Sequence, residues 1–375
     1  KTGVFFMRIK STAAVLCAVV GLAGFAGTSL AESPAEFYKG KTITFLIGAS
    51  PGGGYSNYAG ALARHMGRHI PGNPKIVAKN KRGAGGLKAL KFLMKRAPKD
   101  GTVFAAIFKG SMIEPLVGTR GVKFDAMSLN FVGSLNTESK LCFAWHTTPV
   151  NSFEEMVSKG MITAGSGSTS SIFQYPTVIK NLLGAKLKVI GGYKGSAASL
   201  LALERGEVTG MCGLGWSSLN TQRPQWLKEK KIKLLAQIGY GVEKKLIGKN
   251  VPEIWKFVKD ANKQAAMKLI FYPPGRPYIL PQGTPKDRVK AMQDAFMATT
   301  KDPAFIADAK KIRLAIAPTS GPDMRALYKK LYASSPEVVE LAKAALSKKG
   351  TVKCKKFTDA KYCRASKKKK KKKGS

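Results

Sequence analysis

Lys41-Thr-Ile-Thr-Phe-Leu-Ile-Gly-Ala-Ser-Pro-Gly-Gly-Gly-Tyr-Ser-Asn57 is the stretch of sequence that decides the fold. Residues 42–47 are mostly β-branched and aromatic, which predicts a buried strand, and the glycines that follow end it. Ser56 or Asn57 is expected to cap a helix over residues 58–69. A strand, a glycine loop and a helix start in this order form an anion cradle, because first-turn N–H groups point at the loop. The same pattern also joins strands to helices where no ligand binds.

The pattern repeats along the chain. A strand over residues 76–78 is followed by a glycine-rich turn at 79–86 and a helix over 87–95, and a third strand covers 102–108. Alternating strands and helices with short loops predict an α/β fold with parallel, doubly wound sheets. Ligands of such sheets bind outside the carboxyl ends of the strands.

A second α/β module is expected from about residue 136. It has predicted strands at 141–146, 161–164, 188–190, 208–212 and 233–238, and predicted helices at 152–159, 173–183 and 197–205. An extended segment at 275–281 then leads back to the first module, with helices at 286–300, 303–311 and 323–334. We expect two lobes around a ligand cleft, lobe 1 from residues 32–136 and 265–347, and lobe 2 from residues 137–264. Residues 348–375 form a basic tail.

The two ends and the charge narrow the class of protein. Residues 1–31 hold a basic start, a short apolar run and small residues before Ala31, which predicts a cleaved secretory signal peptide and a periplasmic location, with residues 1–6 as an upstream extension. The chain carries 64 basic and 22 acidic residues, a net charge of +42, and residues 367–373 are all lysine, as in an added tag. Such charge attracts anions of every kind. No zinc finger, RNA-binding signature or basic heptad accompanies it, so a solvated surface is the favoured interpretation.

Cysteine usage agrees with export. Cys142, Cys212, Cys354 and Cys363 remain after the signal peptide, and four cysteines allow three pairings. Cys354 and Cys363 enclose a short polar loop and are expected to pair. Cys142 and Cys212 would then pair if their strands are neighbours. A zinc site is not favoured, because no Cys-x-x-Cys accompanies them.

An ordered set of motifs resembles a known family, the periplasmic solute-binding receptors of tripartite tricarboxylate transporters. The matching motifs are Ser50-Pro-Gly-Gly-Gly54, Asn80-Lys-Arg-Gly-Ala-Gly-Gly86, Ala97-Pro-Lys-Asp-Gly101, Gly165-Ser-Gly-Ser168, Gly192-Tyr-Lys-Gly-Ser196, Leu203-Glu-Arg-Gly-Glu207 and Arg276-Pro-Tyr278. The resemblance covers about residues 37–345. It implies a two-lobed periplasmic-binding-protein (Venus flytrap) architecture closing on a small carboxylated solute, without a cofactor, and membrane permease subunits of a secondary transporter as partners. The chain is expected to be a monomer.

The resemblance implies that two loops hold the carboxylates, one from each lobe. With the cleft residues suggested by the loop contexts, the candidate ligand-binding residues are Ser50, Gly52, Gly53, Gly54, Tyr55, Ser56, Asn57, Ser166, Gly167, Ser168, Thr169, Tyr193, Gly195, Ser196 and Trp216. Family members commonly have an acidic residue where Ser56 stands, and its loss favours an anionic ligand. Whether the ligand is a dicarboxylate, a tricarboxylate or an aromatic acid stays open.

Three rival functions each have one sequence feature in their favour. Gly48-Ala-Ser-Pro-Gly52 matches the nucleophile turn of a serine hydrolase, with Ser50 as nucleophile, but Pro51 has no N–H to donate to an oxyanion. His65 and His69 have the spacing of a zinc protease without its glutamate base. A binding protein for nucleic acid or another anionic polymer would explain the charge but has no motif. We therefore expect a receptor and no enzyme.

Overall fold

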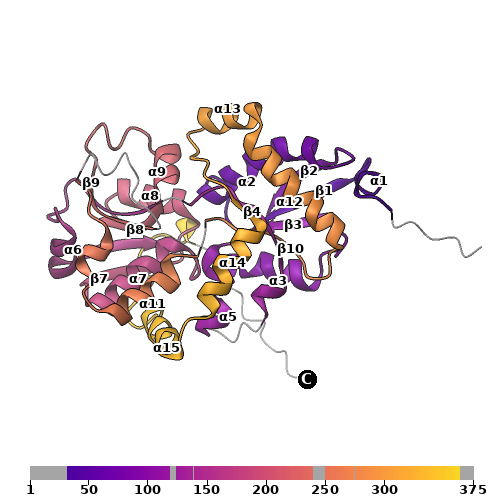
Figure 1. Cartoon of the computed structure of the whole chain (residues 1–375). Coiled ribbons are helices and arrows are strands. Elements are labelled where there is room, and N and C mark those ends of the chain that lie inside the picture. Colours follow the sequence, from indigo (N-terminus) through magenta and orange to yellow (C-terminus); the bar gives the residue numbers. More distant parts are fainter. Residues whose placement is uncertain (1–31, 119–123, 138, 240–249, 274, 364–375) are drawn as a thin grey trace, which may run out of the picture. The chain divides into compact units, whose positions relative to one another are not determined.

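The computed structural model describes residues 32–118, 124–137, 139–239, 250–273 and 275–363. The predicted signal peptide and the lysine run at 367–373 lie outside these residues. The described part forms two six-stranded sheets with helices packed on them (Figure 1). Within it, no helix is long and apolar enough to cross a bilayer.

The first sheet contains the predicted strand at residues 42–47 as one of its inner strands. Its strand order is β11 (Thr319–Ser320), β4 (Asn130–Ser134), β10 (Tyr278–Leu280), β3 (Val103–Ala106), β1 (Thr42–Ile47) and β2 (Lys75–Asn80). The predicted strand at 42–47 is confirmed to the residue, and β1 pairs in parallel with β2 and β3. Phe45 and Phe104 stack with their ring centroids 3.9 Å apart, so the aromatic residues of the run lie in the core.

The second sheet has the order β12 (Val352–Lys353), β7 (Leu187–Gly191), β6 (Met161–Gly165), β8 (Gly210–Gly215), β5 (Lys140–Trp145) and β9 (Ile232–Ile238). The strands β12, β7, β6 and β8 are parallel to one another. The fold class predicted from the sequence, a two-lobed α/β architecture, is confirmed.

Both sheets also contain antiparallel strands, which a purely parallel pattern did not predict. β10 runs antiparallel to β3, and β5 runs antiparallel to β8. Each of these strands follows a passage of the chain from one sheet to the other. The chain arrives at the edge where the parallel strands end, so the new strand must run away from that edge.

The helices are local products of the sequence, and most lie where the patterns predicted them. The described α-helices are α1 (Pro34–Tyr38), α2 (Gly54–His65), α3 (Leu87–Lys95), α4 (Lys109–Met112), α5 (Glu114–Val117), α6 (Phe153–Lys159), α7 (Ser171–Leu183), α8 (Ser196–Glu204), α9 (Trp216–Gln222), α11 (Ala261–Phe271), α12 (Lys286–Lys301), α13 (Pro303–Lys311), α14 (Gly321–Tyr332) and α15 (Pro336–Ala345). The predicted bounds of α3 and α13 are confirmed. α1, α4, α5, α9, α11 and α15 were not predicted.

The predicted N-cap of the first glycine-loop helix is wrong. α2 begins at Gly54 with Gly53 as its N-cap, and no side chain caps it. Ser56 lies inside the first turn, where its hydroxyl donates to the carbonyl oxygen of Ser50 at 2.9 Å. The helix can start earlier because the glycine turn leaves its first N–H groups open to a ligand or to water.

The chain passes between the sheets a third time between α14, which packs on β4, and α15. β12 joins the edge of the second sheet beside β7, and α15 packs against α7 and α11, as the lower part of Figure 1 shows. The lobe boundaries expected at 136/137 and 264/265 stay a prediction.

Both predicted disulfides, Cys142–Cys212 and Cys354–Cys363, are present. The first joins directly paired residues of β5 and β8.

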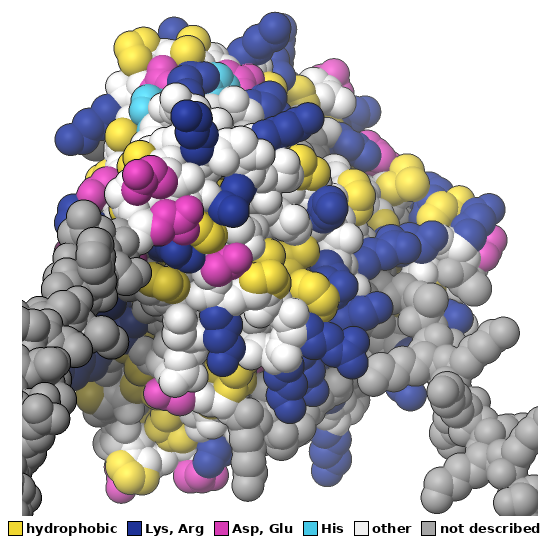
Figure 2. Space-filling model, turned by 90° about the vertical axis from the view of Figure 1, so that its right-hand side faces the viewer, with side chains coloured by type: hydrophobic (Ala, Val, Ile, Leu, Met, Phe, Trp, Pro, Cys, Tyr) yellow, Lys and Arg dark blue, Asp and Glu magenta, His cyan; other side chains and the backbone are white. Residues whose placement is uncertain are grey.

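Basic side chains cover much of the surface. Figure 2 shows many Lys and Arg side chains and fewer Asp and Glu on the face turned to the viewer. Lys88, Lys91 and Lys95 on α3 are exposed, which agrees with a solvated helix face. A regular row on a helix that packs its other side on the core needs no bound polymer to explain it.

Candidate ligand-binding site

A cavity of about 90 Å³ lies where the two sheets meet. It is lined by the loops that follow β1, β6, β7 and β8, and by Lys140 and Arg276, the residues at which the chain enters β5 and approaches β10. A buried water needs about 10–15 Å³ by this kind of measure, so the space suits roughly six to nine water-sized groups. The cavity therefore lies outside the carboxyl ends of parallel strands, as expected, and matches a small solute.

Three of the longer described helices begin at the cavity wall. Gly53 and Gly54 of α2, Ser170 and Ser171 of α7, and Gly195 and Ser196 of α8 are the N-cap and first residues of these helices, and all line the cavity. The helices have 12, 13 and 9 residues, long enough to carry a helix dipole. Each N-terminus favours an anion by about 0.3–1 kcal/mol.

These helices lack the caps that most other long helices of the chain have. The N-cap residues of α2, α7 and α8, which are Gly53, Ser170 and Gly195, make no side-chain hydrogen bond to the first turn. By contrast, a serine or aspartate side chain caps each of α6, α11, α13, α14 and α15. α3 and α12, which begin elsewhere, are also uncapped. First-turn N–H groups at the cavity are thus available to a bound acceptor.

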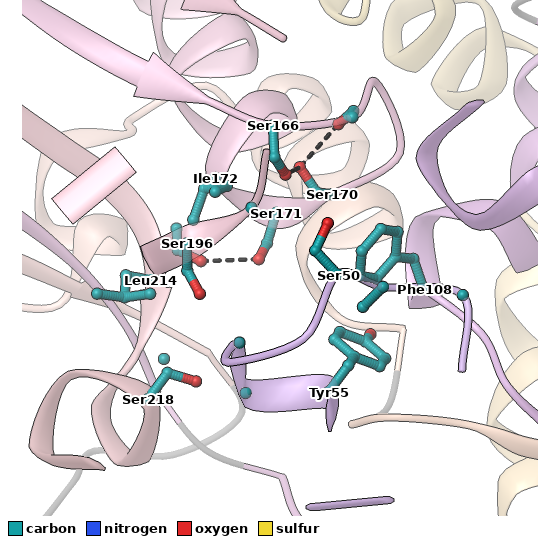
Figure 3. Close-up of a pocket in the computed structure, with 18 of the residues that line it drawn as sticks. Ser50, Tyr55, Phe108, Ser166, Ser170, Ser171, Ile172, Ser196, Leu214 and Ser218 are labelled. Atoms are coloured by element: carbon teal, nitrogen blue, oxygen red, sulfur yellow. Dashed lines mark hydrogen bonds between the residues drawn. The ribbon is translucent and has the colours of Figure 1, made fainter. Parts of the chain in front are cut away.

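Serine hydroxyls line the wall on the side of the second sheet. Ser166 donates to the Ser170 hydroxyl at 2.8 Å, and Ser170 donates to the carbonyl oxygen of Gly167 at 2.7 Å. Ser171 donates to the carbonyl oxygen of Gly213 at 2.7 Å. Figure 3 shows these serines on one side of the cavity and Ser50 on the other. The bonds fix the hydroxyl positions before any ligand arrives, which lowers the entropic cost of binding.

The charged residues that line the cavity are all basic. They are Arg82, Lys109, Lys140, Lys194 and Arg276, and no Asp or Glu is among the described lining residues. Such a wall with uncapped helix starts favours a negatively charged ligand and disfavours a cation or a zwitterion with an exposed ammonium.

Arg276 is the most firmly placed of these cations. Only 4 % of its surface is exposed. Its guanidinium donates to Asn136 Oδ1 and, at 3.1 Å, to Ser218 Oγ of α9, and it lies over the Tyr58 ring at 4.1 Å from the centroid. Because Arg276 precedes β10 and Ser218 follows β8, this hydrogen bond joins the two sides of the cavity.

Lys109 makes a second connection across the two sides. Its ammonium donates to the Tyr175 hydroxyl at 2.8 Å and to the carbonyl oxygen of Phe271 at 2.6 Å, and its backbone N–H donates to the Tyr55 hydroxyl at 3.1 Å. The ammonium is therefore turned toward α7 and α11, while its positive charge stays beside the cavity.

Ten of the fifteen candidate residues line the cavity. They are Ser50, Gly53, Gly54, Tyr55, Ser166, Gly167, Thr169, Tyr193, Gly195 and Ser196. Gly52, Ser56, Asn57, Ser168 and Trp216 are not among the lining residues. Ser56 is held by Asn80, which donates to its hydroxyl at 2.8 Å. Trp216 is buried in the core of the second sheet.

Tyr193 lines the cavity in an unexpected way. Its hydroxyl donates to Glu207 Oε2 at 3.2 Å. Burial, with the nearby Glu207 carboxylate, raises the pKa of Tyr193 well above its ordinary value, so the phenol stays a donor at any physiological pH. The aromatic ring is part of the core, and the residue acts on the cavity through the loop that it anchors.

Sequence reasoning missed several lining residues, above all Arg276, Ser218, Lys109 and Lys140. Arg276 belonged to a recognised motif but lay in a segment interpreted only as a crossing. A signal for Ser218 existed, because Gly213-Leu-Gly215 ends a strand just before α9, in the same pattern as the other loops.

The three histidines of the chain lie elsewhere. His65 and Asp308 form an ion pair at 2.9 Å, and His69 and Asp302 form one at 2.8 Å, both against α13. The hydrogen bond from His69, with one from a neighbouring arginine, holds the pKa of Asp302 well below its usual range. His146 contacts the adjacent Trp145 ring. No group of side chains in the described ranges could hold a metal ion.

Solved structures of other proteins share this fold. BugD, a periplasmic binding protein, matches with a TM-score of 0.64 and 22% identity over 84% of this chain and 100% of its own. MatC from Rhodopseudomonas palustris with bound malate has a TM-score of 0.62 and 18% identity over 81% and 99%. A second R. palustris protein, with adipate, has a TM-score of 0.60 and 18% identity over 81% of this chain and 97% of its own.

At these identities the solved structures show the fold alone, and no curated protein matches the sequence. The family model of the tripartite tricarboxylate transporter family receptor, however, matches residues 61–329, more than half of the chain. The resemblance inferred from the motifs is thus confirmed: this chain belongs to the tripartite tricarboxylate transporter receptor family.

Proposed function

We propose that this protein is an extracytoplasmic receptor that captures a small carboxylate in the cavity between its two sheets and delivers it to membrane permease subunits. The observation that carries the proposal is the meeting of three uncapped helix N-termini and five basic side chains at one cavity, whose described lining residues include no Asp or Glu. Family membership supplies the transport role.

The chemistry of the wall fits carboxylates well. A carboxylate offers several acceptor positions and no donor when ionised, and the cavity offers backbone N–H groups, hydroxyls and cations. Each charge-assisted hydrogen bond contributes about 1.5–3 kcal/mol. Solved structures of the same fold hold malate and adipate, which supports a ligand with two carboxylates, one for each side of the cavity.

We assign the ligand contacts to the ten lining candidates, together with Arg276, Ser218, Ser170 and Ser171. Gly53 and Gly54 would donate backbone N–H groups from one side, and the serines of α7 and α8 would bind from the other. Gly52, Ser56, Asn57, Ser168 and Trp216 would act on the ligand only through the shape of their loops.

A hydrolytic role for Ser50 has little support. Among the described lining residues there is no histidine or carboxylate that could serve as its general base. The lysines of the wall are a weaker alternative base, and Pro51 still leaves the oxyanion without the usual N–H donor. We therefore propose binding without chemical conversion, by a periplasmic monomer that needs no cofactor and has no specific affinity for nucleic acid.

A thermal-shift screen tests the proposal. The chain without residues 1–31 and 364–375 is mixed with malate, adipate, citrate and benzoate, each beside its neutral amide. A carboxylate at 100 times its Kd should stabilise the fold by about 2.7 kcal/mol, and its amide should not. Stabilisation by duplex DNA alone, or ester hydrolysis that is lost in Ser50→Ala, would replace this proposal with a rival.

A further inference from the structure

The chain after α15 lies beyond the matched family residues and returns to the ligand cavity. Asn181 Nδ2 of α7 donates to the carbonyl oxygens of Ala345 and Ser347 at 2.9 and 2.8 Å, and Lys180 Nζ donates to that of Gly350 at 3.0 Å. These bonds lead the chain along α7 to β12. We use "C-terminal clasp" for residues 352–363, which begin in β12 and end at Cys363.

The C-terminal clasp holds the loop at residues 191–196, which we call the cavity loop. Lys353 pairs with Gly191 in the β12–β7 ladder, and Tyr193 forms an antiparallel bridge with Cys363. The backbone N–H of Lys194 donates to the carbonyl oxygen of Tyr362 at 3.3 Å. The Cys354–Cys363 disulfide joins the residue after Lys353 to the residue that bridges Tyr193, so the contacts on the two flanks of the cavity loop are linked covalently.

A side-chain network ties the clasp to the same loop. Tyr193 donates from its hydroxyl to Glu207 at 3.2 Å, and Arg205 Nε donates to Glu207 at 2.7 Å. The Arg205 guanidinium lies 3.6 Å from the centroid of the Tyr362 ring. Tyr193 is therefore held at its backbone by Cys363 and at its hydroxyl by Glu207, and Arg205 links Glu207 to the Tyr362 ring.

The cavity loop needs such support because of its composition. Gly192 and Gly195 have φ angles of 115° and 134°, a region open to glycine. Tyr193, Lys194, Gly195 and Ser196 all line the cavity, and Ser196 begins α8. A shift of this loop would move a helix N-terminus and a cation at once.

We propose that the C-terminal clasp positions the cavity loop for anion binding, with Cys354, Tyr362 and Cys363 as positioning residues that do not touch the ligand. The binding readout rests on the proposed function, whereas the geometry of the loop does not. The clasp residues do not line the cavity. They act on it through backbone contacts with the cavity loop, so loss of the clasp should change affinity more than fold.

Two measurements on the full chain test this proposal. The first is the Kd for malate and adipate by calorimetry, and the second is amide hydrogen exchange of residues 192–196 without ligand. In Cys354→Ser/Cys363→Ser, the Kd of the probe that the wild type binds should rise by about tenfold or more, and exchange in the loop should quicken by a similar factor. The matched control, Cys142→Ala/Cys212→Ala, removes the other disulfide and should lower the melting temperature without either change.

The ring of Tyr362 offers a test that keeps the disulfide. Tyr362→Ala should weaken binding and quicken exchange in the loop, and Tyr362→Phe, which keeps the ring under Arg205, should restore both. This pair decides the matter if the cysteine variant fails to fold. Wild-type Kd and exchange in a folded clasp variant would overturn the proposal. If the wild type binds neither probe, the proposed function fails for these solutes, and the exchange data alone decide whether the clasp positions the loop.

Discussion

Replacing Gly54 with alanine adds a single methyl group at the cavity wall, beside Ser218 and Arg276. A Cβ at Gly54 would lie 2.2 Å from Ser218 Oγ and 2.9 Å from Arg276 Nη2, so the serine side chain must rotate away. The backbone of α2 tolerates alanine, because Gly54 is helical and lacks a positive φ. The substitution therefore targets the hydrogen bond between Arg276 and Ser218, which is 3.1 Å long.

The size of the effect follows from that bond. Loss of a charge-assisted hydrogen bond costs about 1.5–3 kcal/mol. Because the bond joins the two sides of the cavity, it stabilises the arrangement in which both sides face the ligand, so we expect its loss to weaken binding. The Kd for malate or adipate should rise about 10- to 150-fold. Gly60→Ala on the same helix is the matched control, since its Cβ would meet nothing closer than Arg64 Nη1 at 3.6 Å.

Calorimetric titration of five proteins measures this effect: the wild type, Gly54→Ala, Gly60→Ala, Ser218→Ala and the Gly54→Ala/Ser218→Ala double variant. Gly60→Ala should keep the wild-type Kd and gain about 0.5–1 kcal/mol of stability from helix propensity. In a Ser218→Ala background the Arg276 bond is already absent, so adding Gly54→Ala should change Kd by less than about threefold. A wild-type Kd in Gly54→Ala, or an equal loss in the Ser218→Ala background, would refute the reasoning.

Three further predictions concern charge, pH and covalent links. Lys194→Gln should raise the Kd of a carboxylate by about 3- to 10-fold, and calorimetry should show a weaker salt dependence, because one cation of the wall is removed. Asp302→Asn keeps a capping group for α13 but removes the charge paired with His69. Since hydrogen bonding lowers the pKa of Asp302 in the fold, its contribution is present above the ordinary aspartate pKa of about 3.9, and the gap in melting temperature between wild type and variant should close as the pH falls below that value. Removing Cys142–Cys212, which closes a 70-residue separation, should cost up to about 4 kcal/mol in denaturant unfolding, and a loss below about 1 kcal/mol would contradict this.

Sequence reasoning worked where the structure is local. The β-branched run at 42–47 forms β1, and the helices at 87–95 and 303–311 have the predicted bounds, because periodicity and turn residues act over a few positions. The pairing of Cys142 with Cys212 depended only on the two strands being neighbours. The strand and the two helices need no knowledge of distant parts of the chain, whereas the disulfide joins residues 70 positions apart and followed from the expected pairing of Cys354 with Cys363.

The rest depends on contacts between distant segments. Arg276 reaches the wall because the chain passes between the sheets beside Asn136, and Ser218 faces it from α9. The return of the chain to β12 is set by contacts with α7, which no local pattern encodes. Trp216 turned into the core because its side-chain direction depends on how α9 packs on the second sheet. Ser56 was misread as a cap for the opposite reason, since the uncapped start of α2 departs from the local preference where a ligand is expected.

The central claim is that the cavity between the sheets holds a carboxylate through its charge. Calorimetry of the wild-type chain with adipate and malate, each beside its diamide of the same shape, tests this claim most directly. The account predicts that at least one of the two acids binds one-to-one with a Kd at or below the micromolar range, that Gly54→Ala weakens it, and that the matching diamide binds at least about 100-fold more weakly. Binding of acid and diamide with equal affinity, or of neither acid, would contradict it.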